Sequence, residues 1–152
     1  MENNVIFEKA VEYKLSVVQN ENNFDSKQLK SSQESADYCR QFYYDDIDIY
    51  ESFFIVLLNR SCHVQAWVKI SQGGMNATVV DSILVLKYMI DSLSKNVILC
   101  HNHPGGSLVP SEQDLKLTKK IKELVTLMDC SVLDHIILTS TNYYSFADNG
   151  IL

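Results

Sequence analysis

Residues 97–114, VILCHNHPGGSLVPSEQD, contain in succession the signals for a buried strand, a turn and a helix. The first four residues are apolar and mostly branched, which is typical of a strand with both faces covered. The Pro-Gly-Gly sequence at residues 104–106 ends that strand. Ser111 marks the start of the helix, because serine is a favourable N-cap residue.

Three side chains of this stretch are predicted to converge on one point. Alternate residues of a strand face the same side, so His101 and His103 would project together from its C-terminal end, with Asn102 turned away. Asp114 would lie in the first turn of the following helix. Two imidazoles and one carboxylate are the ligands of a catalytic zinc site, in which a fourth position stays open for water. The sequence therefore predicts a metal site formed by His101, His103 and Asp114.

A purely structural interpretation exists for part of this pattern. Ser111 and Asp114 have the spacing of a capping box, although the second position of a capping box is usually Glu or Gln. That interpretation explains neither histidine. The metal site is therefore the better hypothesis for the four residues taken together.

The pattern His-x-His-Pro followed by Ser-x-x-Asp resembles the motif of the JAMM metalloproteases, also called JAB or MPN+ proteins. The sequences HNHPGG, PSEQD and, at residues 133–137, LDHII are similar to the RadC branch of that family. The likeness runs from about Asp46 to the C-terminus. We therefore expect residues 1–43 to be an N-terminal extension, which does not resemble a helix-hairpin-helix, and residues 44–152 to be a RadC-like JAB/MPN domain.

The resemblance implies a fold and an activity. The family fold is α/β, a three-layer α/β/α sandwich around a mixed sheet, of the cytidine-deaminase-like kind. The implied activity is zinc-dependent hydrolysis of peptide or isopeptide bonds by a metal-activated water, with Zn²⁺ as cofactor and a peptide or protein as substrate. Two alternatives stay open: a RadC-type protein associated with DNA repair, and a non-catalytic MPN interaction module.

Two further residues receive catalytic roles. Glu51 precedes the apolar run at residues 52–58, and composition alone favours an exposed position at the mouth of that strand. Because the family places its general acid/base glutamate just before such a strand, the resemblance makes Glu51 the matching residue. Ser111 would donate a hydrogen bond to the oxyanion of the tetrahedral intermediate.

The rest of the chain predicts the scaffold. Helices are expected at residues 32–42, capped by Ser31 or Ser32, at residues 79–94, capped by Thr78, and over the apolar stripe from Leu117 to Met128. Strands are expected at residues 52–58, 63–70, 132–138 and 143–146, with one or two more among residues 1–18. The helix at residues 79–94 is apolar around much of its surface and should be largely buried. His135 is interpreted as structural or as a support for the metal site, because no nucleophile is evident nearby.

Composition limits the partners of this chain. Its 152 residues suit one domain, and its net charge of -6 argues against a large phosphate-binding surface, so nucleic-acid binding is not expected. No apolar run approaches the ~20 residues that span a membrane, and the N-terminus does not resemble a secretory signal. The widely spaced Cys39, Cys62, Cys100 and Cys130 are expected to be reduced thiols. These features predict a cytoplasmic protein that does not bind membranes.

Overall fold

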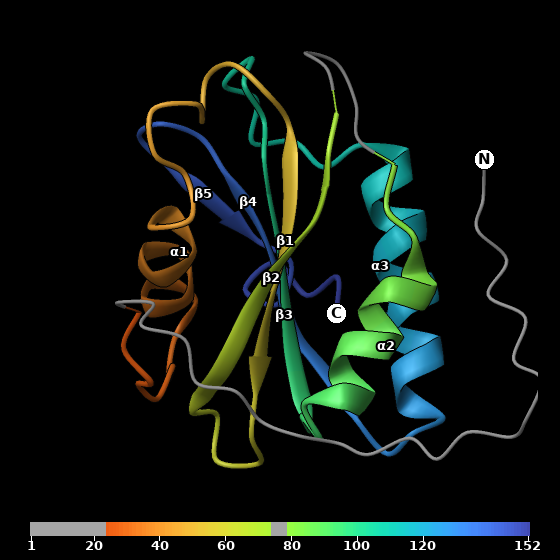
Figure 1. Ribbon diagram of the computed structural model, residues 1–152. Coiled ribbons are helices and arrows are strands. Elements are labelled where there is room, and N and C mark those ends of the chain that lie inside the picture. The colour runs from red at the N-terminus through yellow and green to blue at the C-terminus, as the bar shows by residue number, and fades with distance from the viewer. Residues whose placement is uncertain (1–23, 74–78) are drawn as a thin grey trace, which may run out of the picture.

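The computed structural model describes residues 24–73 and 79–152, which form a five-stranded sheet with helices on both faces (Figure 1). Along the chain the elements are α1 (Ser32–Arg40), β1 (Ser52–Leu58), β2 (Val64–Gln72), α2 (Ser82–Asp91), β3 (Asn96–Asn102), α3 (Glu112–Thr126), β4 (Ser131–Leu138) and β5 (Tyr143–Ser145). Helix α1 covers one face of the sheet, and α2 and α3 cover the other (Figure 1). The predicted three-layer α/β/α sandwich is therefore confirmed.

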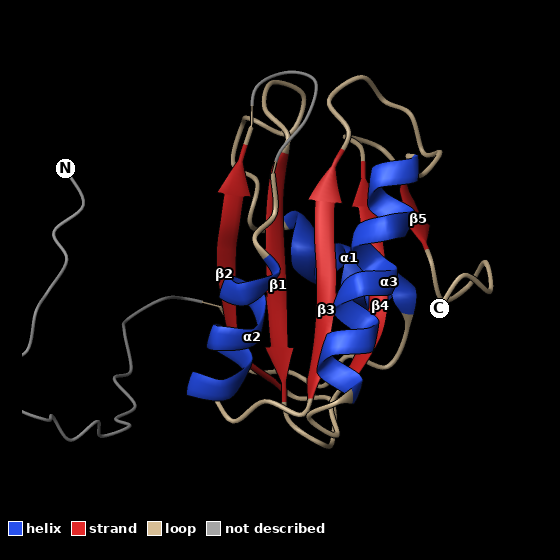
Figure 2. Cartoon of the chain, turned by 90° about the vertical axis from the view of Figure 1, so that its right-hand side faces the viewer, coloured by secondary structure: helices blue, strands red, loops and turns tan. Residues whose placement is uncertain are grey.

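The sheet is mixed and has the strand order β2-β1-β3-β4-β5. Strand β1 is antiparallel to both β2 and β3, whereas β3 and β4 are parallel and are connected through α3. Because β1 and β3 run in opposite directions, the start of β1 lies beside the end of β3, and Phe53 pairs with His101. Helix α3 begins at the same edge of the sheet (Figure 2). Three separate segments of the chain thus meet at one edge.

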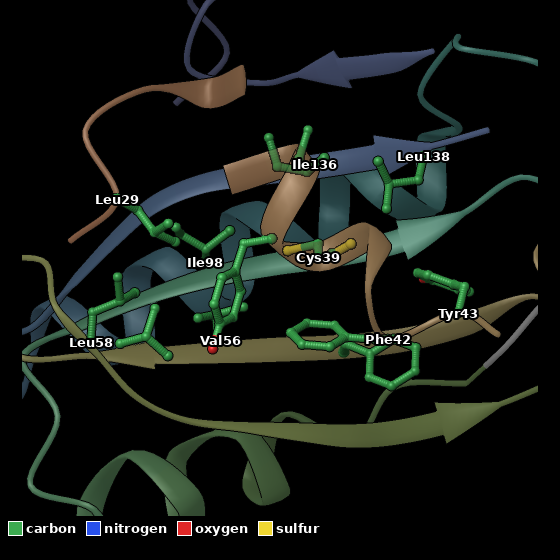
Figure 3. Close-up of a cluster of buried hydrophobic side chains, with 14 residues drawn as sticks. Leu29, Cys39, Phe42, Tyr43, Val56, Leu58, Ile98, Ile136 and Leu138 are labelled. Carbon is green, nitrogen blue, oxygen red and sulfur yellow. The ribbon is translucent and has the colours of Figure 1, made fainter. Parts of the chain in front are cut away.

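Side-chain alternation along the strands creates two cores. Every residue of β1 is buried, because both faces of this strand are covered. Its residues Phe54, Val56 and Leu58 belong to the core under α1, where Cys39 and Phe42 pack over the sheet (Figure 3). The alternate residues face the opposite core, under α2 and α3: Phe53, Ile55 and Leu57. Full burial of each such side chain stabilises the fold by roughly 1.5–3 kcal/mol.

Helix α1 is fixed at both ends. The side chain of Ser31 accepts a hydrogen bond from the Glu34 N–H, as one of the two predicted caps. At the other end, the guanidinium of Arg40 donates to three backbone carbonyls in the connection between β4 and β5, those of Thr139, Ser140 and Asn142, at 2.5, 3.3 and 3.2 Å. The helix is thereby attached to the far half of the sheet. The predicted division of the chain after residue 43 stays a prediction.

Helix α2 differs from the sequence-based expectation. It begins at Ser82, and its N-cap is Asp81, whose side chain accepts a hydrogen bond from Ile83 N at 2.9 Å. The predicted cap, Thr78, lies outside the described residues. The prediction that this helix is largely buried is wrong: Ile83 and Ile90 in the helix are 70% and 54% exposed, and Leu93, which is predicted to belong to it but follows its C-cap, is 73% exposed. A helix in the outer layer of a sandwich contacts the sheet on one side only.

The other elements lie within a few residues of their predicted positions. Strand β1 has the expected bounds, and β2 and β4 are displaced at their ends by one or two residues. The strands expected among residues 1–18 lie outside the described residues. All four cysteines are free thiols in the structure. Within residues 24–73 and 79–152, none of the helices has both the length and the apolarity of a membrane-spanning segment.

Candidate metal centre

The structure brings together His101, His103 and Asp114. His101 Nε2 lies 3.0 Å from His103 Nε2 and 3.2 Å from Asp114 Oδ1, and His103 Nε2 lies 3.6 Å from Asp114 Oδ2. The three side chains are 1%, 16% and 13% exposed. The centre is therefore sheltered, but it is open to solvent on the side of His103 and Asp114.

The chain around the turn orients these residues. The His103 N–H donates to the Leu138 carbonyl at 2.9 Å, which extends the pairing with β4 beyond the end of β3. The Gly106 N–H then donates to the His103 carbonyl at 3.0 Å, and Gly106 has φ of 80°, a conformation that favours glycine. This tight turn directs the chain toward the start of α3.

The three side chains offer ligand atoms that all lie within 4.8 Å of one another, close enough to hold one metal ion. Zinc binds histidine nitrogen and carboxylate oxygen at about 2.0–2.2 Å, so two ligands of a tetrahedral site lie about 3.3 Å apart. His101 Nε2 lies at distances around that value from both of its neighbours, 3.0 Å from His103 Nε2 and 3.2 Å from Asp114 Oδ1. The 3.6 Å contact of His103 Nε2 is with the other oxygen of the carboxylate, Oδ2. Two imidazoles and a carboxylate also match the ligand chemistry of zinc. The residues therefore fit a divalent metal of this kind.

Ser111 and Asp114 form a capping box as well. Ser111 Oγ accepts from the Asp114 N–H at 3.1 Å, and the Ser111 N–H donates to Asp114 Oδ2 at 2.7 Å. The Ser111 hydroxyl also donates to Oδ2, at 2.7 Å. Oδ1 faces His101, and the capping oxygen Oδ2 also lies 3.6 Å from His103 Nε2. The same carboxylate therefore caps the helix and completes the donor triangle, which consists of the two imidazoles and the carboxylate of this site. The oxyanion role of Ser111 stays a prediction.

The Asp114 carboxyl is held in its ionised form. Burial acts to raise the pKa of Asp114, but its hydrogen bonds with His101, His103 and Ser111 and the positive charge of His101 outweigh burial and hold this pKa well below its usual range. The pKa of His103 is raised, chiefly by its hydrogen bond with Asp114. The carboxylate is therefore in the state that binds cations.

Glu51 directly precedes β1, and its charge acts on His103. Phe53, two residues later and inside β1, stacks its ring on that of His101 with centroids 6.0 Å apart. The charge of Glu51 also contributes to the raised pKa of His103. Its backbone carbonyl accepts from the Gly73 N–H at 2.9 Å, which attaches this position to the end of β2. Glu51 is therefore near enough to His103 for its charge to act on the imidazole, and its function as general base stays a prediction.

Asn102 has a function that the sequence does not indicate. Its side chain is buried on the opposite face of the sheet, as predicted, and it makes three hydrogen bonds, two with the segment before β1 and one with the first residue of β1. Its amide donates to the carbonyls of Ile47 and Tyr50 at 2.6 and 2.8 Å, and its oxygen accepts from the Ser52 N–H at 2.8 Å. Asn102 therefore holds the segment that carries Glu51 against the end of β3.

His135 and Thr118 lie behind the donor triangle. His135 Nε2 is 2.8 Å from His101 Nδ1, and His135 Nδ1 is 2.6 Å from Thr118 Oγ1. Burial lowers the pKa of His135 well below its ordinary value, and the positive charge of His101 lowers it further. Sequence reasoning missed Thr118, although it lies four residues after Asp114 and therefore on the same face of α3.

Comparison with known proteins identifies relatives of the chain. A family model described as RadC-like JAB domain matches residues 29–151. A UPF0758 protein of Flavobacterium johnsoniae is 45% identical over 102 residues, which cover 67% of this chain and 44% of that protein. Similar proteins of Porphyromonas gingivalis and Pelobacter propionicus are 37% and 35% identical, over 67% and 73% of this chain and 45% and 49% of their own lengths. The chain thus spans about half the length of the curated relatives it matches.

Proposed function

The chain belongs to the RadC-like JAB domain family, and from this membership and the site we propose that it is a zinc-dependent hydrolase of peptide or isopeptide bonds. The proposal is carried by the convergence of His101, His103 and Asp114 within 3.0–3.6 Å of one another. The effect of the Glu51 charge on His103 supports it.

A zinc ion held by His101, His103 and Asp114 would lower the pKa of a bound water toward about 7 and would polarise the substrate carbonyl. Glu51 accepts the proton of the attacking water and returns it to the leaving amine. Asn102 keeps Glu51 in place through the hydrogen bonds to its segment. The Ser111 hydroxyl donates to the oxyanion by turning its hydrogen away from Asp114, which the Ser111 N–H still holds at 2.7 Å.

The alternatives have less support. A non-catalytic interaction module needs neither a complete set of metal ligands nor a carboxylate beside them, and this chain has both. A DNA-associated function needs phosphate contacts, which come mainly from Lys and Arg, whereas this chain has a net charge of -6.

The decisive experiment compares wild type with Glu51→Gln, with Asp48→Asn as a matched control that removes one exposed negative charge from the same segment. We expect all three proteins to bind one zinc ion per chain by elemental analysis, because Glu51 is not among the ligands. A protein extract is then incubated with each protein and labelled with an amine-reactive reagent. New α-amines report peptide cleavage, and newly freed lysine ε-amines report isopeptide cleavage.

Glu51→Gln should lower the release of amines by about 10²–10⁴-fold, the usual contribution of general acid–base catalysis, and Asp48→Asn should not. Equal amine release by wild type and Glu51→Gln, with zinc bound to both, would contradict the proposed function.

A further inference from the structure

We infer that His135 and Thr118 are positioning residues of the metal centre, which together fix the proton of His101 on Nδ1 and so leave Nε2 free to bind a metal. The inference rests on the proposed function for the identity of the ion. It is carried by one continuous chain of hydrogen bonds, from the backbone of α3 through Thr118 and His135 to His101.

The direction of this chain is set at Thr118. Its hydroxyl lies 2.6 Å from the carbonyl of Asp114, and since a carbonyl only accepts, the single hydroxyl hydrogen is donated there. The same hydroxyl must therefore accept from His135 Nδ1, 2.6 Å away. His135 carries its hydrogen on Nδ1 as a result.

The positions of the hydrogens on the facing nitrogens of His135 and His101 follow from this assignment. His135 is fully buried, and burial favours the neutral ring, which has one hydrogen only. Its Nε2 is then an acceptor, so His101 Nδ1, 2.8 Å away, must donate to it. The Nε2 of a neutral His101 consequently presents a lone pair toward His103 and Asp114.

His103 also carries its hydrogen on Nδ1, but a single backbone contact is enough to fix it there. Its Nδ1 lies 2.8 Å from the carbonyl of Ser107, which can only accept, so the tautomer of His103 is fixed by the backbone alone. His101 instead faces a second imidazole, which can donate or accept. Thr118 removes that ambiguity. The same turn of α3 therefore provides the Asp114 ligand and sets the protonation of the His101 ligand.

Thr118→Val tests the inference, because it removes the hydroxyl and nearly conserves the shape of the side chain. His135 Nδ1–H would then lack its acceptor, the other tautomer of His135 would donate to His101 Nδ1, and the His101 hydrogen would move to Nε2. We expect zinc affinity, measured by competition with a chelator, to fall about 10–100-fold, the usual cost of removing a group that orients a metal ligand. Thr118→Ser, which keeps the hydroxyl, should have the zinc affinity of wild type.

Thr126→Val is the matched control. Thr126 is in the same helix and donates to the carbonyl four residues earlier, that of Lys122, at 2.7 Å, but it is exposed and lies away from the metal centre. Its replacement should leave zinc affinity unchanged. This comparison separates the loss of a helix hydrogen bond from the loss of the contact with His135.

The second readout is the ¹⁵N NMR spectrum of the histidine rings in chelator-treated protein at alkaline pH. Wild type, Thr118→Ser and Thr126→Val should show His101 with hydrogen on Nδ1, and Thr118→Val should show it on Nε2. The inference is overturned if Thr118→Val keeps both the zinc affinity and the His101 tautomer of wild type. Because this readout needs neither zinc nor catalysis, a wild-type protein without hydrolytic activity would contradict the proposed function and leave the NMR result to decide the inference.

Discussion

Asn102 and His103 are neighbours in the sequence, but their side chains act on opposite faces of the sheet. The imidazole of His103 belongs to the donor triangle, whereas the amide of Asn102 binds the segment before β1. Alternation along β3 therefore lets two consecutive residues fix both parts of the centre, the metal ligands and the segment that carries Glu51.

Asn102→Asp tests this function at the scale of the residue. An aspartate could still accept from the Ser52 N–H, but it would place carboxylate oxygens against the carbonyls of Ile47 and Tyr50. We expect the free energy of unfolding, measured with denaturant, to fall by roughly 2–4 kcal/mol, because buried polar groups lose their partners. Hydrolysis should fall more than zinc affinity.

Asn149→Asp is the control for this prediction, since the Asn149 amide makes a single hydrogen bond, to the Ser145 carbonyl, near the C-terminus. An Asn102→Asp protein in which zinc affinity and hydrolysis decrease equally would show that Asn102 supports the whole centre and not the Glu51 segment in particular.

At the scale of the element, the bounds of a strand or helix are easiest to predict from the sequence when all of its residues are buried. All seven residues of β1 are buried, so its apolar run coincides with the strand. The predicted extent of burial of α2 is wrong, because an apolar helix surface does not reveal whether a second layer will cover it. Ile83 and Leu93 look like core residues in the sequence and are exposed in the structure.

The convergence of these three side chains could be predicted for a similar reason. His101, His103 and Asp114 belong to one strand–turn–helix unit, whose geometry follows from local rules. The contacts of Asn102 with Ser52 and of His135 with Thr118 depend on which strands become neighbours. That information lies in the strand order, which no local pattern specifies.

Arg40 is predicted to anchor the end of α1 to the connection between β4 and β5. Its guanidinium joins the end of α1 to the carbonyls of Thr139, Ser140 and Asn142. Arg40→Ala should lower the free energy of unfolding by about 1.5–3 kcal/mol, the range for a hydrogen bond from a charged group. Arg60→Ala, in the exposed turn between β1 and β2, should lower it by less than about 0.5 kcal/mol. Equal effects in denaturant titrations would show that Arg40 does not anchor the helix.

At the scale of the whole molecule, metal binding and folding are coupled. The donor triangle exists only when the end of β3 and the start of α3 are in place, so an ion that binds it stabilises the folded state. Free zinc at about 100 times its dissociation constant should raise the free energy of unfolding by about 2.7 kcal/mol and the melting temperature by roughly 5–10 °C. A chelator should reverse both changes.

His103→Ala should abolish this zinc-dependent rise in melting temperature, since one of the three donors is lost. His63→Ala removes a histidine from the hairpin between β1 and β2 and should retain the full rise. If zinc stabilises wild type and His103→Ala equally in calorimetry, zinc binds somewhere other than the donor triangle.

The short stretch of chain between His101 and Asp114 has a consequence for the order of events during refolding. The entropy lost in closing a loop grows with the logarithm of its length, so the three ion-binding side chains can meet after only a brief segment has become ordered. Glu51 lies in the segment just before β1 and reaches the site only when the antiparallel pairing of β1 with β3 is complete. A refolding chain should accordingly capture its ion before it acquires the ability to turn over substrate.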